Sequence, residues 1–97
     1  MKVNVFYMGG LYDVTSREME IIELENVATV KSLLSLLVMR YGSRFKDLVM
    51  ESRSGLETPW LKVMISLNGK DVGAFQGLDT ELKNGDSVAF LSMIGGG

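Results

Sequence analysis

Residues 28–42 read ATVKSLLSLLVMRYG, and this stretch decides the fold class of the chain. Thr29 can accept a hydrogen bond from an unpaired amide at the start of a helix, and Gly42 suits the left-handed backbone that often ends one. The apolar side chains between them recur three and four residues apart: Val30, Leu33, Leu34, Leu37, Val38 and Tyr41. The pattern predicts a helix over 30–41 whose buried stripe covers the apolar face of a sheet, in an α+β domain.

Two stretches before this helix predict a β-hairpin. Residues 2–7 alternate and are rich in β-branched and aromatic side chains, which favour a strand. Residues 18–24 predict the second strand, with Met19 and Ile21 on one side. Gly9-Gly10 between them is interpreted as part of the hairpin turn, because a phosphate-binding loop needs a fuller glycine motif that opens a helix.

The part after the helix predicts a loop and then three more strands. Residues 43–60 hold many charged residues and the single proline, and are interpreted as a variable loop. Residues 61–67 alternate into Asn68-Gly69, a dipeptide suited to a tight hairpin turn, and a short return strand is expected over 70–75. Residues 87–93 predict a last strand that is apolar on both sides, as in the centre of a sheet.

The composition argues against several classes of function. The 97 residues fit one domain and contain neither cysteine nor histidine, so the commonest nucleophile, general base and transition-metal ligands are missing from any internal active site. The formal net charge of −2 argues against nucleic-acid binding, which needs clustered basic residues. No apolar run is long enough for a membrane span, and the start lacks a signal-peptide pattern, so a cytoplasmic protein is expected.

Several short motifs together resemble one family. They are Ala28-Thr29-Val30, Tyr41-Gly42, the segments LNGKD at 67–71 and LDTELKNGDSV at 78–88, and the terminal glycines. They resemble the MoaD/ThiS family of ubiquitin-like sulfur carriers, and the final stretch is also similar to the ubiquitin-related modifier family. The resemblance implies a ubiquitin-like β-grasp fold, with a mixed sheet of four to five strands packed on one main helix. The expected division is a domain over 1–94 and a flexible glycine tail over 95–97.

The resemblance also implies a mechanism in which this chain is a carrier and not an enzyme. An E1-like adenylating enzyme would use ATP to activate the carboxylate of Gly97, and a sulfurtransferase would help convert it to a thiocarboxylate. Gly95 and Gly96 would thread into the activating enzyme, because residues without a Cβ pass through a narrow channel. The sulfur would go to molybdopterin, thiamin or tRNA, through a MoaE-like or thiazole-synthase-like acceptor in the first two cases, and no cofactor would be bound.

Two alternatives stay open at this point. Gly97 could instead be conjugated to lysines of target proteins, as in a ubiquitin-like modifier. The domain could also be an interaction module with an incidental tail, which is the less favoured interpretation. Metal binding by the acidic residues Asp79, Glu81 and Asp86 is not favoured, because acidic residues next to Asn-Gly usually accept hydrogen bonds from turn amides.

A carrier also needs an apolar docking surface, because a three-residue tail buries little area. Four side chains are candidates for its lining: Met64, Phe75, Phe90 and Met93. Phe90 and Met93 lie in the last strand, where a core position is the favoured interpretation.

Overall fold

The computed structural model describes residues 1–51 and 60–92. Its main sheet contains β1 (Lys2–Met8), β2 (Met19–Glu23), β5 (Val63–Leu67), β6 (Lys70–Asp71) and β7 (Ser87–Ser92). The helices are α1 (Gly10–Thr15), α2 (Val30–Tyr41) and α3 (Ser43–Val49), and the 3-10 turns are Val72–Ala74 and Gly77–Asp79. The short strands β3 (Met50–Glu51) and β4 (Trp60–Leu61) pair with each other in a separate ribbon.

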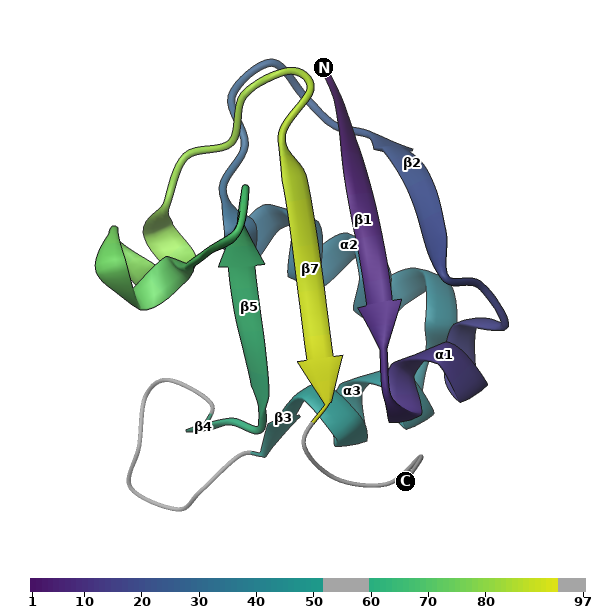
Figure 1. Cartoon of the computed structure of the whole chain (residues 1–97). Coiled ribbons are helices and arrows are strands. Elements are labelled where there is room, and N and C mark those ends of the chain that lie inside the picture. The colour runs from purple at the N-terminus through teal and green to yellow at the C-terminus, as the bar shows by residue number, and fades with distance from the viewer. Residues whose placement is uncertain (52–59, 93–97) are drawn as a thin grey trace.

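The main sheet is mixed and has the order β2-β1-β7-β5-β6. Its two central strands, β1 and β7, run parallel and end at the same edge of the sheet, whereas all other neighbours are antiparallel (Figure 1). Strands from the two ends of the sequence therefore lie side by side, and the last described residue, Ser92, lies near the end of β1. This arrangement confirms the predicted mixed sheet of an α+β domain.

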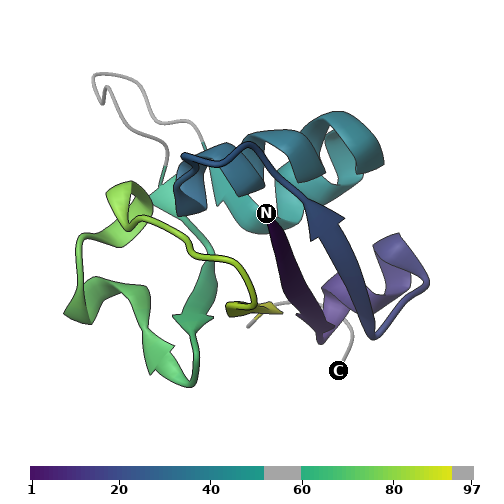
Figure 2. The ribbon, with the colours of Figure 1, turned by 90° about the horizontal axis from the view of Figure 1, so that it is seen from above.

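Helix α2 covers one face of the sheet, as predicted (Figure 2). The Thr29 hydroxyl accepts the Ser32 amide at 3.2 Å, and Gly42 ends the helix at φ +84°. The buried residues of α2 are Val30, Leu33, Leu34 and Leu37, which pack with Val3, Val5, Ile22, Ile65, Val88 and Phe90 from the strands. The first four residues of the predicted stripe therefore lie in the core, whereas Val38 and Tyr41 are partly buried and pack against it.

The prediction of a loop over 43–60 is wrong for its first half. Residues 43–49 form α3, whose Phe45 and Val49 side chains are completely buried. The Phe45 ring stacks on Tyr41 at 5.7 Å between centroids and meets Phe90 edge-on at 6.5 Å. Phe45 and Val49 are four residues apart, but three exposed charged residues in the same segment obscure this helical spacing in the sequence. The second half of the predicted loop, residues 52–59, lies outside the described part.

The interpretation of Gly9-Gly10 as a simple hairpin turn is also wrong. Gly10 begins α1, and Leu11 of this helix is buried in the core. The first two strands are therefore joined through a helical turn, although they do pair antiparallel as predicted. Gly9 has φ +67°, and this backbone conformation turns the chain from β1 into α1.

The predicted turn after β5 is confirmed, whereas the return strand that follows it is shorter than predicted. Asn68 and Gly69 both have positive φ, 51° and 88°, and form the expected tight turn between β5 and β6. The return strand is shorter than predicted, because it ends at Asp71. The Asp71 carboxylate accepts the Gly73 amide at 2.7 Å and starts a 3-10 turn in place of further pairing.

Candidate functional site

The sheet face opposite α2 carries a row of exposed apolar side chains. Met8, Leu91 and Met64 come from β1, β7 and β5, and the strand register pairs Met8 with Leu91 and Leu91 with Met64. They are 45%, 37% and 48% exposed. We call these three residues the open-face row. It crosses the sheet one residue before Ser92, the last described residue before the terminal glycines.

The structure separates the docking residues predicted from the sequence. Met64 is in the open-face row, and Phe75 is 47% exposed but lies in the 3-10 region, beside residues at the opposite end of β7. Phe90 is 0% exposed, so the favoured core position is confirmed and the docking candidate is wrong. It points to the α2 side because it alternates with Leu91 along β7. Met93 lies outside the described residues, as do Gly95–Gly97.

Met8 and Leu91 were not among the docking candidates expected from the sequence. Each alternates with buried neighbours along its strand, and this alternation could have placed it on the outer face. What the alternation could not show is that they adjoin each other. That contact depends on the parallel pairing of β1 with β7, which joins residues more than 80 positions apart.

Gly9, which follows β1, lies close to the end of β7. A Cβ built on Gly9 would stand 2.7 Å from the Ser92 carbonyl oxygen, closer than real Cβ atoms come to other atoms. The positive φ of Gly9 also disfavours any other residue. The close approach of these two backbones therefore depends on glycine, and it constrains the position of Ser92.

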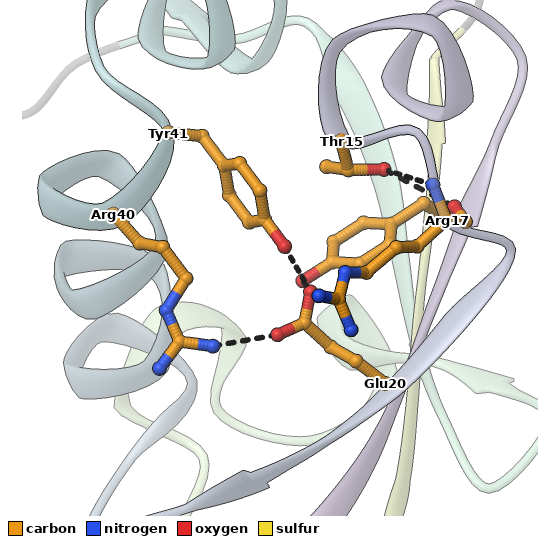
Figure 3. Close-up of polar contacts among 6 residues, drawn as sticks. Thr15, Arg17, Glu20, Arg40 and Tyr41 are labelled. Carbon is orange, nitrogen blue, oxygen red and sulfur yellow. Dashed lines mark hydrogen bonds and ion pairs between the residues drawn. The ribbon is translucent and has the colours of Figure 1, made fainter.

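A buried carboxylate ties β1, β2 and α2 together at one end of the core. Glu20 is on the buried side of β2 and accepts hydrogen bonds from the hydroxyls of Tyr7, at 3.0 Å, and Tyr41. Arg40 donates to its other oxygen at 2.6 Å (Figure 3). Burying a carboxylate without such partners would be costly, so the four side chains act as one unit. Met19 and Ile21 do share one side of β2, as predicted, but that side faces away from the core.

The same network changes the acidity of its tyrosines. Burial raises the pKa of Tyr7 well above its ordinary value of 10.0, and the negative charge of Glu20 adds to this effect. Burial also raises the pKa of Tyr41, with a further contribution from its hydrogen bond to Glu20, while the positive charge of Arg17 opposes the change. Both hydroxyls are therefore kept protonated in the folded state.

We predict that this network weakens the fold at high pH. The unfolded chain loses the Tyr7 proton near pH 10.0 and the folded chain keeps it, so the free energy of unfolding falls as pH rises above that value. Tyr7 alone should contribute a slope of about 1.4 kcal/mol per pH unit. Urea unfolding of the parent and the Tyr7→Phe variant on both sides of pH 10.0 measures it, with Tyr12→Phe as the exposed control. Equal slopes for parent and Tyr7→Phe would contradict the prediction.

The described residues contain neither a candidate metal site nor a membrane-spanning helix. Within 1–51 and 60–92 there is no group of three acidic, histidine or cysteine residues that could hold a metal ion. None of the helices in these ranges is both long and apolar enough to cross a membrane. Asp86 has the turn role expected from the sequence, because its carboxylate accepts the Lys83 amide at 2.7 Å.

Comparison with known proteins identifies the family. The model of the ThiS family matches residues 5–97, which includes the three terminal glycines. The chain belongs to the ThiS family. A protein of Archaeoglobus fulgidus assigned as a sulfur carrier is 30% identical to this ThiS-family chain over 69 residues, which cover 71% of this chain and 74% of that protein.

Two solved structures support the same grouping. A Pyrococcus furiosus protein assigned as subunit 1 of a molybdopterin converting factor is 28% identical, with a TM-score of 0.74, and the match covers 97% of this chain and 99% of that one. Urm1 from Trypanosoma brucei is 25% identical, with a TM-score of 0.73 and coverage of 99% and 95%. The predicted family resemblance and the ubiquitin-like β-grasp fold are confirmed. Members of this family are small sulfur carriers and ubiquitin-like modifiers.

Proposed function

We propose that this ThiS-family chain is a sulfur carrier whose Gly97 carboxylate is adenylated by an E1-like enzyme and converted to a thiocarboxylate. The observation that carries the proposal is the family match, which extends through the described domain to the last glycine. The sulfur-carrier assignment of the A. fulgidus relative supports it. The absence of cysteine from the sequence is consistent with sulfur carried on the terminal carboxyl.

The proposed chemistry uses only the end of this chain. The Gly97 carboxylate attacks the α-phosphate of ATP in the partner enzyme, pyrophosphate leaves and an acyl-adenylate forms. A persulfide held by a sulfurtransferase then attacks the acyl carbon, and AMP leaves. A thiol of the partner cleaves the resulting sulfur–sulfur bond, which leaves the thiocarboxylate on Gly97 and a disulfide on the partner. A MoaE-like or thiazole-synthase-like enzyme is the proposed acceptor.

The domain contributes position and docking. The open-face row lies next to Ser92, three residues before the predicted tail, so an enzyme that binds this row would hold the domain close to Gly95–Gly97. Apolar side chains that a partner covers completely contribute most to binding. We therefore assign the open-face row as the docking surface for the activating enzyme.

We predict that Met64→Glu raises the KM of the activating enzyme for this chain by roughly tenfold, because the new carboxylate would be buried without a partner. Met39→Glu is the matched control, since it makes the same exchange at an 87% exposed position on α2. Rates of adenylation at varied carrier concentration give KM for each variant. Equal KM values for Met64→Glu and Met39→Glu would show that the open-face row is not the docking surface.

The experiment that tests the proposed function is intact mass spectrometry. The full chain is incubated with the activating enzyme from the same organism, ATP and a sulfur donor. Replacement of one carboxylate oxygen by sulfur should add a small, defined mass, and this product should form only with ATP. Alkylation of the thiocarboxylate should then shift the product to a higher mass. A chain that keeps its original mass while a known carrier reacts under the same conditions would refute the proposal.

A second candidate function is protein modification. The similarity to Urm1, whose name denotes a ubiquitin-related modifier, favours it. In that case a lysine amine of a target protein attacks the activated Gly97 carbonyl and forms an isopeptide bond. The same reaction, run with a cell extract and followed on a denaturing gel, would then show ATP-dependent bands of higher mass that contain this chain.

A further inference from the structure

Strand β2 forms one edge of the main sheet, and its outer side has no strand partner among the described residues (Figure 1). Its pairing with β1 shows which backbone groups are free. Met1 and Leu24 exchange two hydrogen bonds, of 2.8 and 2.7 Å, and the Tyr7 amide donates to the Glu18 carbonyl at 2.9 Å. In an antiparallel pair such residues alternate with residues whose amide and carbonyl point away.

The alternation assigns three residues of β2 to the free edge. Glu18, Glu20, Ile22 and Leu24 bond to β1, so the amides and carbonyls of Met19, Ile21 and Glu23 point outward. No residue within 1–51 or 60–92 takes these outward groups as backbone partners. An extended peptide could therefore pair with β2 without disturbing the existing sheet.

Two hollows follow the seam between this edge and α2. The first is lined by Glu23, Glu25, Leu24, Val27, Ala28, Ser32 and Leu36. The second is lined by Arg17, Arg40, Tyr41, Thr15, Met19, Glu20 and Ile21. On the helix side, Ser32, Leu36 and Arg40 are spaced by four and thus share one face of α2. We call the two hollows together the β2 groove.

The two ends of the β2 groove carry opposite charge. Glu23 and Glu25 line the end next to the start of α2, and Arg17 and Arg40 line the other end. Figure 3 shows the two arginines on either side of Glu20, which forms an ion pair with Arg40. Between the charged ends, the groove is lined by Leu36 of α2 and by Met19 and Ile21 of the edge strand, whose side chains lie on the face of the sheet opposite α2.

We propose that the β2 groove binds an extended segment of a partner protein, antiparallel to β2, with a basic residue at its amino end and an acidic residue at its carboxyl end. The outward amides and carbonyls of β2 supply the backbone pairing, and the charges at the two ends set the direction. The basic residue meets Glu23 and Glu25, and the acidic residue meets Arg17 and Arg40. This interface is separate from the open-face row, so the partner can hold the carrier while its tail is being activated.

The test uses a short peptide probe and amide NMR of the full chain. The probe is acetylated and amidated, begins with lysine, alternates valine and threonine, and ends with aspartate. It should shift the amides along β2 and slow hydrogen exchange at Met19, Ile21 and Glu23. A peptide of the same composition with lysine and aspartate exchanged should bind about tenfold more weakly, because each ion pair becomes a repulsion.

A charge-exchange variant sharpens the test. Arg17→Glu combined with Glu23→Lys leaves Arg40 and Glu25 to cancel the new charges and should abolish the preference between the two peptides, whereas the distant pair Lys70→Glu with Glu81→Lys should leave it unchanged. Both double variants keep the net charge. Equal affinity of the parent chain for the two peptides, shifts confined to the open-face row, or self-association of the chain through β2 would each overturn the proposal.

Discussion

Removal of Gly96 and Gly97 should give a folded chain whose rate of ATP-dependent activation is at least about a hundredfold lower. Each residue of an extended tail contributes about 3.3–3.6 Å of reach, so the shortened carboxylate would stop roughly 7 Å short of the α-phosphate. In-line attack requires the reacting atoms to be about 3–3.5 Å apart. Pyrophosphate release by the activating enzyme measures the loss directly.

The truncated chain also carries its own control for folding. The main sheet and the core described here end at Ser92, so the melting temperature should match that of the parent. A chain that unfolds earlier would show that the tail stabilises the domain. Activation that continues at the parent rate would instead support the third interpretation, an interaction module with an incidental tail.

Gly9→Ala should lower the free energy of unfolding by more than about 2 kcal/mol and slow activation of the tail. The new Cβ would require a backbone with φ +67° and would stand 2.7 Å from the Ser92 carbonyl oxygen. That oxygen belongs to the backbone and cannot rotate away like a side chain. The end of β7 must then move, together with the start of the tail. For a domain of this size the melting temperature should fall by about 10 °C or more.

Two other glycines separate backbone strain from contact. Gly69 and Gly85 both have φ +88°, and a Cβ on either would have no atom of the described chain within 4 Å. Gly69→Ala and Gly85→Ala should therefore cost only about 1–2 kcal/mol each, from the left-handed backbone alone. They should also leave the activation rate unchanged. If Gly9→Ala behaves like these two variants, its contact with Ser92 has no role in positioning the tail.

The predictions that succeeded rest on signals carried by neighbouring residues. Thr29 can cap only the helix that follows it, and the stripe of α2 repeats every three or four residues, so both can be read along the chain. Asn68-Gly69 likewise tolerates positive φ whatever surrounds it. These elements, with the terminal glycines, were enough to suggest the family that the comparison then showed.

The failures concern residues whose role depends on distant neighbours. Glu20 looks like an exposed strand residue, but two tyrosines and an arginine from other elements make its burial favourable. The apolar residues of α3 were hidden among charged ones, and Phe45 is buried only because Tyr7, Tyr41 and Phe90 surround it. Phe90 stayed a docking candidate beside its favoured core position because sequence alternation does not say which face of the sheet α2 covers.

The sequence by itself determined the main helix, the strands of the sheet, the tight turn at Asn68-Gly69 and the family to which the glycine tail points. Only the tertiary structure decided which residues lie around Ser92, the last described residue before that tail. Met8, Leu91 and Met64 form one row, and Gly9 touches Ser92, because the first and last strands pair in parallel at the centre of the sheet. Helix caps and turns are stabilised by nearby residues, whereas a docking surface is assembled by contacts between distant ones.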